Sequence, residues 1–330
     1  MINKKALISD IAGLSQPLTK LVETVARGAG ILYEPIHKKR MAKATAEEIK
    51  IIADACQNNL QLPVNYEKDG LSISTNKQVR ELAQRAMLRN LAQEMNKQQN
   101  IESVIDYAKE ALKEEKKVSK IPVNQTWLSN FFESAGHVEE DDLQKIWGKL
   151  LAGEIKQPNS YSLRTLHILK NMSKKEALLF KETCKLVMRY NALYFIPSRE
   201  DIVKKYEIHY PDISLLEQCG LISAPTFLTV HYTVTPNLPA TIFNKNLAGL
   251  LQTDVATPAQ RNDTIYSLTA SGIELFKIIN VKSNNNFLIE YVKSLENKTG
   301  HIFVNIYRIK KREGNDKKGV LVLDKNHPIY

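Results

Sequence analysis

Apolar residues recur with the period of one helix face along the first part of the chain. Within residues 15–28 they lie at i, i+3, i+4, i+7 and i+8, a spacing that predicts an amphipathic helix. The same kind of spacing predicts a long helix over residues 35–59 and two more at 77–98 and 101–116. Residues 60–75 are polar, and we interpret them as a linker.

The helical pattern continues to about residue 190 with stronger start and stop signals. Four carboxylates at 139–142 precede an apolar face that contains Trp147, and negative charge is favourable at a helix N-terminus. A turn at Pro158 separates this helix from a short one at 163–170. Ser173, followed three residues later by a Glu, predicts a capping box for the next helix.

After residue 190 the hydrophobic period changes from that of a helix to that of a strand. Residues 226–234 alternate as a strand does, a proline-rich loop follows, and a second strand is predicted at 264–268. Two short helices precede these strands and one follows them, which is the outline of a winged helix-turn-helix domain. Two further strands around Gly314 predict a β-hairpin.

The predicted fold is therefore mainly α, with an α+β winged-helix-like domain and a C-terminal β-hairpin after the helical part. The predicted divisions are an N-terminal long-helix region, a helical domain, the winged-helix-like domain and the basic hairpin, at residues 1–120, 121–190, 191–285 and 286–330.

Net charge is mildly positive, with 46 Lys and Arg against 36 Asp and Glu. The excess is spread along the chain, so it permits contact with nucleic acid or anionic lipid without requiring either. The chain contains no run of about 18 uncharged apolar residues, so no membrane-spanning helix is predicted.

The three cysteines, Cys56, Cys184 and Cys219, are far apart in the sequence. We interpret them as buried reduced thiols, and these indicate a cytoplasmic protein. No second Cys or His follows any of them at the spacing of a zinc ligand pair, so no metal site is predicted.

The most distinctive pattern lies between residues 144 and 166. It consists of Gln144, Trp147, residues 150–154, Pro158, Ser160, Ser162 and residues 164–166. Together with residues 30–48, 97–102 and 266–276, it resembles a bacterial family of unknown function, domain-of-unknown-function family 2806. The helix pair around the tryptophan is also similar to the alpha-type abortive-infection proteins of bacteria, which implies a role in anti-phage defence by analogy. The family supplies no catalytic residue to carry over.

Glu154, Arg164 and His167 surround the turn in this pattern. The glutamate ends one helix and the arginine lies one turn into the next, so the two are predicted to form a buried clasp across Pro158. A salt bridge that fixes the helical hairpin is the favoured interpretation, and catalysis is the alternative.

Two basic clusters are candidate sites for phosphate groups. The first could contact lipid or phosphate, or could simply be the solvated start of a helix: His37, Lys38, Lys39, Arg40 and Lys43. The second could hold nucleic-acid phosphates without base specificity, or could be an exposed loop: Arg308, Lys310, Lys311, Arg312, Lys317 and Lys318. Residues 212–219, the second helix of the winged-helix outline, contain no Lys or Arg, so they are not expected to read bases in the major groove.

Motifs of known enzyme classes, such as HExxH, GxSxG and the Walker A loop, are missing from the sequence. The sequence therefore favours a non-enzymatic protein and predicts no cofactor and no small-molecule substrate. The first functional hypothesis is a macromolecule-binding sensor or adaptor in an anti-phage system, with a protein partner or self-association through the N-terminal helices. The second is a nucleic-acid-binding regulator that uses the C-terminal domain and hairpin. The third is a peripheral membrane effector.

Overall fold

A computed structural model describes residues 15–28, 64–67, 70–73, 77–225, 228–297, 299–313 and 320–330. The chain divides into two compact units, Met1–Ser160 and Tyr161–Tyr330, and each is described by itself. The described residues form ten α-helices and eleven strands, and nine of the strands belong to one antiparallel sheet. The fold is thus mixed α+β. The predicted helical regions and C-terminal strands are present, but the strands make up more of the chain than a mainly α fold implies.

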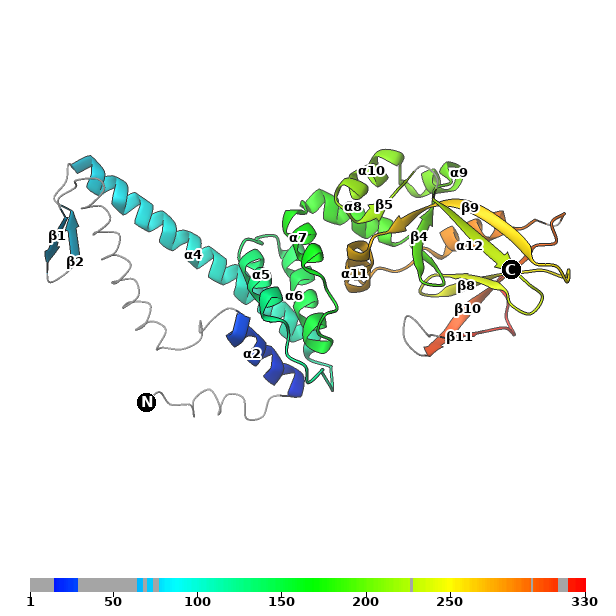
Figure 1. The fold of residues 1–330 in the computed structure, drawn as a ribbon, viewed down its shortest axis with the longest axis horizontal. Helices are drawn as coiled ribbons and strands as arrows, with labels where there is room; N and C mark the ends of the chain where they lie inside the picture. The colour runs from blue at the N-terminus through cyan, green and yellow to red at the C-terminus, as the bar shows by residue number, and fades with distance from the viewer. Residues whose placement is uncertain are drawn as a thin grey trace. The chain divides into compact units, whose positions relative to one another are not determined.

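A single long helix, α4 (Lys77–Leu112), organises the first unit (Figure 1). Two helices were predicted here, but the sequence between them contains neither Gly nor Pro, so nothing interrupts the backbone hydrogen bonds. The C-terminal half of α4 packs on α6 (Asp141–Lys156) and buries Val104, Ala108 and Leu112 completely.

Gly148 permits the close crossing of α4 and α6. A Cβ atom added at this glycine would lie 2.9 Å from the backbone nitrogen of Ala108, and closer still to the Cβ of Tyr107. Real Cβ atoms essentially never approach backbone so closely, so any larger residue would push the two helices apart.

Helices α2 (Gln16–Gly28) and α5 (Gln125–Ala135) complete the first unit's described core. The α5 face stacks Trp127 on Phe131, with ring centroids 5.1 Å apart, and Phe131 lies 5.2 Å from the Trp147 ring. Strands β1 (Val64–Glu67) and β2 (Gly70–Ile73) pair antiparallel where a linker was predicted. The short alternating runs on either side of the turn-favouring Lys-Asp-Gly were the signal for this hairpin.

The second unit is built on the nine-stranded sheet, whose order is β11-β10-β8-β7-β3-β4-β9-β5, with β6 paired to β9. The strands are β3 (Met188–Tyr190), β4 (Leu193–Pro197), β5 (Ile222–Ser223), β6 (Thr229–Val234), β7 (Ala240–Phe243), β8 (Leu247–Gln252), β9 (Ala259–Leu268), β10 (Phe303–Glu313) and β11 (Val320–Leu323).

Two differences from the predicted topology matter for the site. Strands β7 and β8 occupy the stretch predicted as a proline-rich loop, because short apolar runs alternate there with tight turns. The predicted hairpin is present as β10 paired with β11, but β10 also pairs with β8 over six residues. The hairpin is therefore part of the main sheet.

Six helices belong to the second unit: α7 (Leu163–Asn171), α8 (Lys174–Cys184), α9 (Glu200–Val203), α10 (Tyr210–Gln218), α11 (Ala270–Ile278) and α12 (Asn285–Ser294). The predicted capping box of Ser173 is formed at the start of α8. Helix α12 packs on β8 and β10 and buries Phe287, Leu288, Tyr291 and Val292 completely. In the part of the chain that the structure describes, no helix has both the length and the apolar character needed to cross a membrane.

Candidate functional site

Glu154, the acidic residue of the predicted clasp, is buried at the end of α6 with only 1% of its surface exposed. Its carboxylate accepts hydrogen bonds from the backbone N–H groups of Asn159, at 2.5 Å, and Ser160, at 3.0 Å. Asn159 has a φ of 66°, in the left-handed region. Glu154 therefore holds a strained turn by satisfying two backbone donors that would otherwise lack a partner.

Arg164 and His167 lie on α7, in the second unit, and both side chains are exposed. The His167 carbonyl accepts a hydrogen bond from the Asn171 side chain. The clasp that was predicted to join them to Glu154 stays a prediction.

Glu274, on α11, was not singled out from the sequence, yet its hydrogen bonds explain why the pattern contains Ser162 and Thr165. Its carboxylate accepts hydrogen bonds from the backbone N–H of Ser162, at 2.8 Å, and from the hydroxyl of Thr165, at 2.5 Å. Ser162 is also the N-cap of α7, so the carboxylate sits at the positive end of that helix. The pattern thus serves to join α7 to α11.

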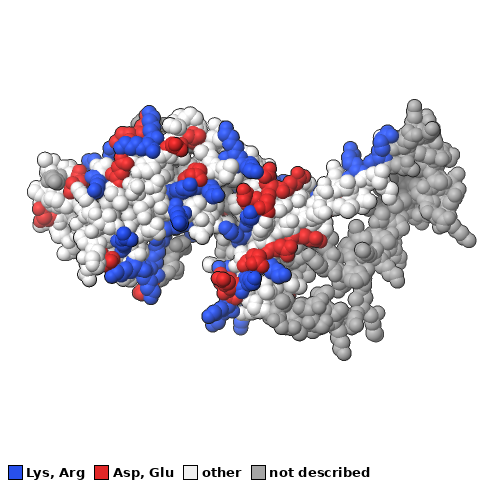
Figure 2. Space-filling model, turned by 180° about the vertical axis from the view of Figure 1, so that it is seen from behind, with Lys and Arg blue, Asp and Glu red and all other residues white. Residues whose placement is uncertain are grey.

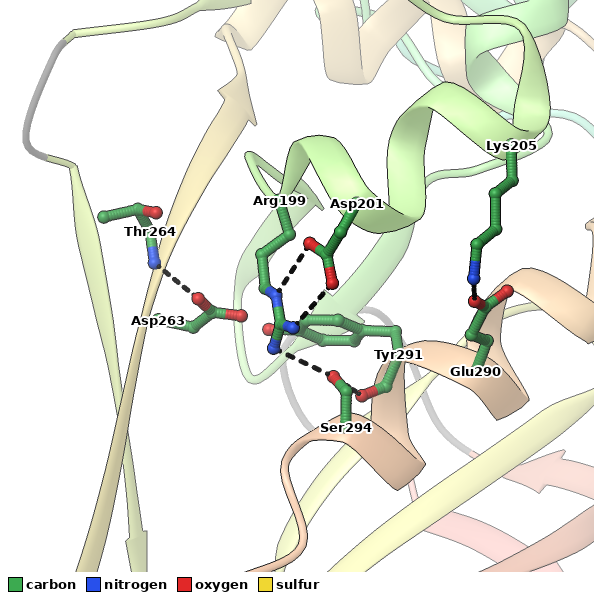
Figure 3. A network of polar contacts seen from close by, with 8 residues as sticks. All are labelled: Arg199, Asp201, Lys205, Asp263, Thr264, Glu290, Tyr291 and Ser294. Atoms are coloured by element: carbon green, nitrogen blue, oxygen red, sulfur yellow. Dashed lines mark hydrogen bonds and ion pairs between the residues drawn. The ribbon is translucent and has the colours of Figure 1, made fainter.

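A polar network joins β9 and α12 to the start of α9 (Figure 3). Arg199 binds Asp201 at 2.9 Å and Ser294 at 3.3 Å, and Asp263 accepts the Thr264 N–H at 3.0 Å. Burial, the largest cause, raises the pKa of Asp263 above its ordinary value, against opposing hydrogen bonds and the nearby arginines. The network braces helices against the sheet, and we assign it a structural role.

Behind this network two tyrosines form a buried pair. The hydroxyl oxygens of Tyr232 and Tyr291 lie 2.8 Å apart, and both side chains are completely buried. Burial raises the pKa of each phenol well above its ordinary value. The pair therefore stays protonated at neutral pH and contributes to packing.

The cysteines have the features of structural thiols. Cys184 is completely buried, and burial raises its pKa; burial also raises the pKa of the half-buried Cys219 to about 11. Neither is therefore ionised at neutral pH, which is what a nucleophilic thiol needs. Cys56 lies outside the described residues. Among the described residues, no group of three or more His, Cys, Asp or Glu side chains could hold a metal ion.

The two predicted basic clusters have different outcomes. The first cluster, His37, Lys38, Lys39, Arg40 and Lys43, lies outside the described residues, as do Lys317 and Lys318 of the second. Of the remaining cations on β10, Lys310 pairs with Asp324 and Lys311 with Glu313, each at 3.0 Å. Arg308 is exposed, and Arg312 reaches a depression on the second unit.

That depression is open to solvent and has a volume of about 30 Å³. Three of its nine lining residues are cationic, three are aromatic, and none is acidic. The lining residues are Arg189, Lys245 and Arg312, then Tyr194, Phe243 and Phe276, and finally Val187, Met188 and Asn244. We refer to this group as the cationic depression.

The cations are held against the rings. The guanidinium carbons of Arg189 and Arg312 lie 5.6 Å and 5.0 Å from the centroid of the Phe243 ring, so two guanidinium groups share one ring. The Lys245 ammonium lies 5.6 Å from the Phe276 centroid. Each such contact stabilises the cation by about 0.5–2 kcal/mol, depending on solvent exposure. The positive groups are therefore preset in position before any ligand arrives.

Backbone carbonyls fix two of these cations further. Lys245 donates a hydrogen bond to the Val281 carbonyl at 2.9 Å, and Arg312 donates one to the Asn244 carbonyl. Burial lowers the pKa of Lys245, and the positive charge of Arg312 lowers it further, although Cys184 acts in the opposite direction. Lys245 and Arg312 thus lie close enough on one wall for their charges to interact.

Strand pairing brings these residues together from distant parts of the sequence. Arg189 on β3 is the register partner of Phe243 on β7. Lys245 lies in the turn between β7 and β8, and Arg312 is on β10, which pairs with β8. Over most of the face that Figure 2 shows, positive and negative side chains are interspersed. Of the three cations, only Arg312 was singled out from the sequence, because Arg189 and Lys245 each stand alone among uncharged residues.

The second unit therefore contains an antiparallel sheet and a depression lined by cationic and aromatic side chains. The chain matches the family described as "Protein of unknown function (DUF2806)" over residues 84–296, and it belongs to this family, as the residue pattern predicted. Neither a curated protein nor a solved structure matches the chain. The resemblance to abortive-infection proteins stays a prediction.

Proposed function

We propose that this is a non-enzymatic macromolecule-binding protein whose C-terminal unit binds nucleic acid in the cationic depression. The observation that carries the proposal is the convergence of Arg189, Lys245 and Arg312 on three aromatic rings. Proteins that bind single strands combine positive groups for the phosphates with aromatic faces and guanidinium planes for the bases. This combination favours nucleic acid over a purely anionic protein segment, which needs no stacking surface.

The winged-helix-like arrangement remains part of this proposal. Helices α9 and α10 connect β4 with β5, and β9 lies between these two strands in the sheet. Strands β6 to β8 then occupy the place of the wing. Because α10 contains no Lys or Arg, we assign it a bracing or protein-contact role, and we assign nucleic-acid contact to the depression.

The remaining hypotheses rest on other grounds. The anti-phage role rests on the resemblance to abortive-infection proteins alone, and a nucleic-acid-binding sensor is compatible with it. The membrane hypothesis rests on a basic cluster that lies outside the described residues, so the geometry favours it less.

Equilibrium binding measured by fluorescence anisotropy tests the proposal. A labelled single-stranded oligothymidine should bind the wild-type protein at low salt, and its affinity should fall steeply as salt rises. The double variant Lys245→Gln/Arg312→Gln should bind about tenfold or more weakly, because hydrogen bonds to charged groups are worth about 1.5–3 kcal/mol. The matched control Lys310→Gln/Lys311→Gln removes two cations of the same strand that do not line the depression, and should bind nearly as wild type.

Lack of binding at low salt contradicts the proposal. So does equal loss of affinity in the two double variants, because that result would place the contact on the hairpin as a whole.

Self-association is a second candidate function, and exposed apolar residues on α4 favour it. They are Leu82, Met87, Leu88, Leu91 and Met95, each 58–71% exposed. Residues 88, 91 and 95 have the 3,4 spacing of a helix-pair seam, and α4 of a second copy carries the same seam. The molar mass by light scattering should fall to that of one chain in Leu88→Ser/Leu91→Ser. A wild-type mass of one chain at high concentration contradicts this candidate.

A further inference from the structure

We propose that the outer edge of strand β11 binds an extended, acidic segment of a partner protein, which adds to the sheet as one more strand. The inference goes beyond the proposed function, because it assigns a different surface of the second unit and a different class of partner. Strand addition of this kind takes its affinity from main-chain hydrogen bonds and its specificity from alternate side chains.

Strand β11 lies at one end of the nine-stranded sheet (Figure 1). It pairs with β10 on one side, and no strand in the described part of the chain pairs with its other side. The Asp324 N–H, directly after the strand, donates to the Arg308 carbonyl of β10 at 2.9 Å. Because successive residues of an antiparallel strand direct their backbone groups to alternate sides, those of Leu321 and Leu323 point away from β10. The edge therefore presents backbone donors and acceptors to a further strand.

The side chains of β11 suit an interface better than a solvated edge. Val320 and Val322 are 64% and 38% exposed, and they lie on one face of the strand because they are two residues apart. Native proteins usually protect a sheet edge with charged residues, proline, a bulge or a covering segment. Residues 320–323 contain neither a charged residue nor a proline, and the irregularity in the pairing lies on β10. In the described structure this edge is thus open to strand addition.

The charge around β11 selects the occupant. Residues 308–325 contain seven Lys and Arg against three Asp and Glu. The ion pairs of Lys310 and Lys311 lie on the surface, with the lysines 55% and 69% exposed, and such pairs contribute little to stability. A second copy would bring its own positive hairpin against this one, whereas an acidic strand is attracted to it. The charge therefore favours an acidic segment over a second copy.

Nucleic acid is the other anionic candidate, and the direction of the backbone groups disfavours it. The phosphates of a strand accept hydrogen bonds from proteins. The outward carbonyl groups of Leu321 and Leu323 would face those negative oxygens with no donor between them, which is unfavourable. A peptide strand supplies both N–H and C=O groups, so it satisfies both kinds of group at the edge.

Fluorescence anisotropy with two labelled peptides tests the inference on the full chain. One peptide alternates Glu with Val and the other alternates Lys with Val, so the two share a strand pattern and differ in charge. We expect the acidic peptide to bind about tenfold or more tightly than the basic one, with an affinity that falls as salt rises. Equal binding of the two peptides, or no binding of the acidic one, overturns the inference.

A proline substitution separates backbone pairing from side-chain contact. Leu321→Pro removes an N–H group that points outward and leaves the hydrogen bonds to β10 in place, which is where an edge strand tolerates proline. It should bind the acidic peptide about fivefold or more weakly than the matched control Leu321→Ala, which keeps the N–H group. Equal affinity of the two variants contradicts strand addition.

A second matched pair keeps the test decisive if thermal melting shows that Leu321→Pro does not fold. Val320 is exposed, so Val320→Glu and Val320→Lys change the charge at the edge without changing the core. The acidic peptide should bind Val320→Glu several-fold more weakly than Val320→Lys, because like charges repel. The same affinity for both variants would place the peptide elsewhere and overturn the site.

The same variants distinguish this inference from the proposed function. Oligothymidine should bind Leu321→Pro and Leu321→Ala equally, because its proposed site lies in the cationic depression. Loss of oligothymidine binding in Leu321→Pro, with the acidic peptide still bound, places nucleic acid on the edge and overturns the inference. A wild-type dimer in light scattering that Leu321→Pro dissociates assigns the edge to a second copy and overturns it as well. Binding of the acidic peptide without binding of oligothymidine supports this inference and contradicts only the proposed function.

Discussion

Two regions of this chain, the segment 141–180 and the cationic depression, differ in how their distinctive residues relate to the sequence. The segment 141–180 is continuous and conspicuous in sequence, and its signature residues serve the fold: Trp147 is in the core, and Glu154 and Thr165 bond to neighbouring structure. The cationic depression is inconspicuous in sequence and assembled by a sheet from separate strands. A strong sequence pattern here marks packing constraints, while the candidate site depends on pairing between distant strands.

Removal of the Glu154 carboxylate tests most directly whether the segment 141–180 stabilises the fold. Glu154→Ala leaves the N–H groups of Asn159 and Ser160 without their acceptor and should lower the free energy of unfolding of the first unit by about 3 kcal/mol. Both tryptophans lie in that unit, so urea unfolding followed by tryptophan fluorescence reports on it.

Glu133→Ala is the matched control, because Glu133 is exposed on α5 and should change the unfolding free energy by less than about 0.5 kcal/mol. Equal unfolding midpoints for the two variants would show that Glu154 does not stabilise the turn.

A glycine pair on α6 gives effects of opposite sign. Gly148→Ala introduces a Cβ against the α4 backbone and should lower the stability of the first unit by about 2 kcal/mol. Gly153→Ala, one and a half turns further along the same helix, should instead raise it by up to about 1 kcal/mol through helix propensity. Urea unfolding checks both, and stabilisation by Gly148→Ala would mean that the helices do not cross so closely.

A smaller effect is expected from Glu274→Gln, in the second unit. The amide lacks the negative charge that faces the N-terminus of α7, so the unit should lose about 1 kcal/mol. Calorimetry should show this as a lower transition temperature of the second unit, with the tryptophan-detected transition unchanged. A shift in the first transition instead of the second would place the role of Glu274 elsewhere.

The smallest effect is the pH dependence caused by Asp263. Its folded pKa is raised by burial, so the folded state holds the proton more tightly than the unfolded state. Stability from this group is therefore present below the ordinary Asp pKa and is lost as pH rises through the raised folded value. Asp263→Asn should flatten this decline when melting temperature is followed across the acidic range. An unchanged slope would show that the carboxyl is ionised without penalty.

Local determinants made much of the fold predictable. The capping box at Ser173, the turn at Pro158 and the Trp147 face all act within a few residues, and each is present as predicted. Strands β7 and β8 were missed because their stability comes from neighbours in the sheet rather than from a long alternating pattern. Helix α4 was divided in error because polar residues without Gly or Pro do not end a helix.

The site was far less predictable than the fold. Arg312 was singled out as one of a run of cations. Nothing in that run shows that Lys310 and Lys311 pair with acidic residues, or that Arg312 lies against the Phe243 ring. Arg189 and Lys245 gained their significance only through the pairing of β3, β7, β8 and β10. Such pairings depend on contacts between residues far apart in sequence, which periodicity does not encode.

The affinity of three proteins for one labelled single-stranded oligothymidine tests the central contrast most directly. Measured at a temperature where all are folded, Lys245→Gln/Arg312→Gln should bind about tenfold or more weakly than wild type. Glu154→Ala should unfold more easily and bind as wild type. The contrary result, full affinity in the depression variant and loss of affinity in Glu154→Ala, would place the binding function in the conspicuous segment and contradict the account.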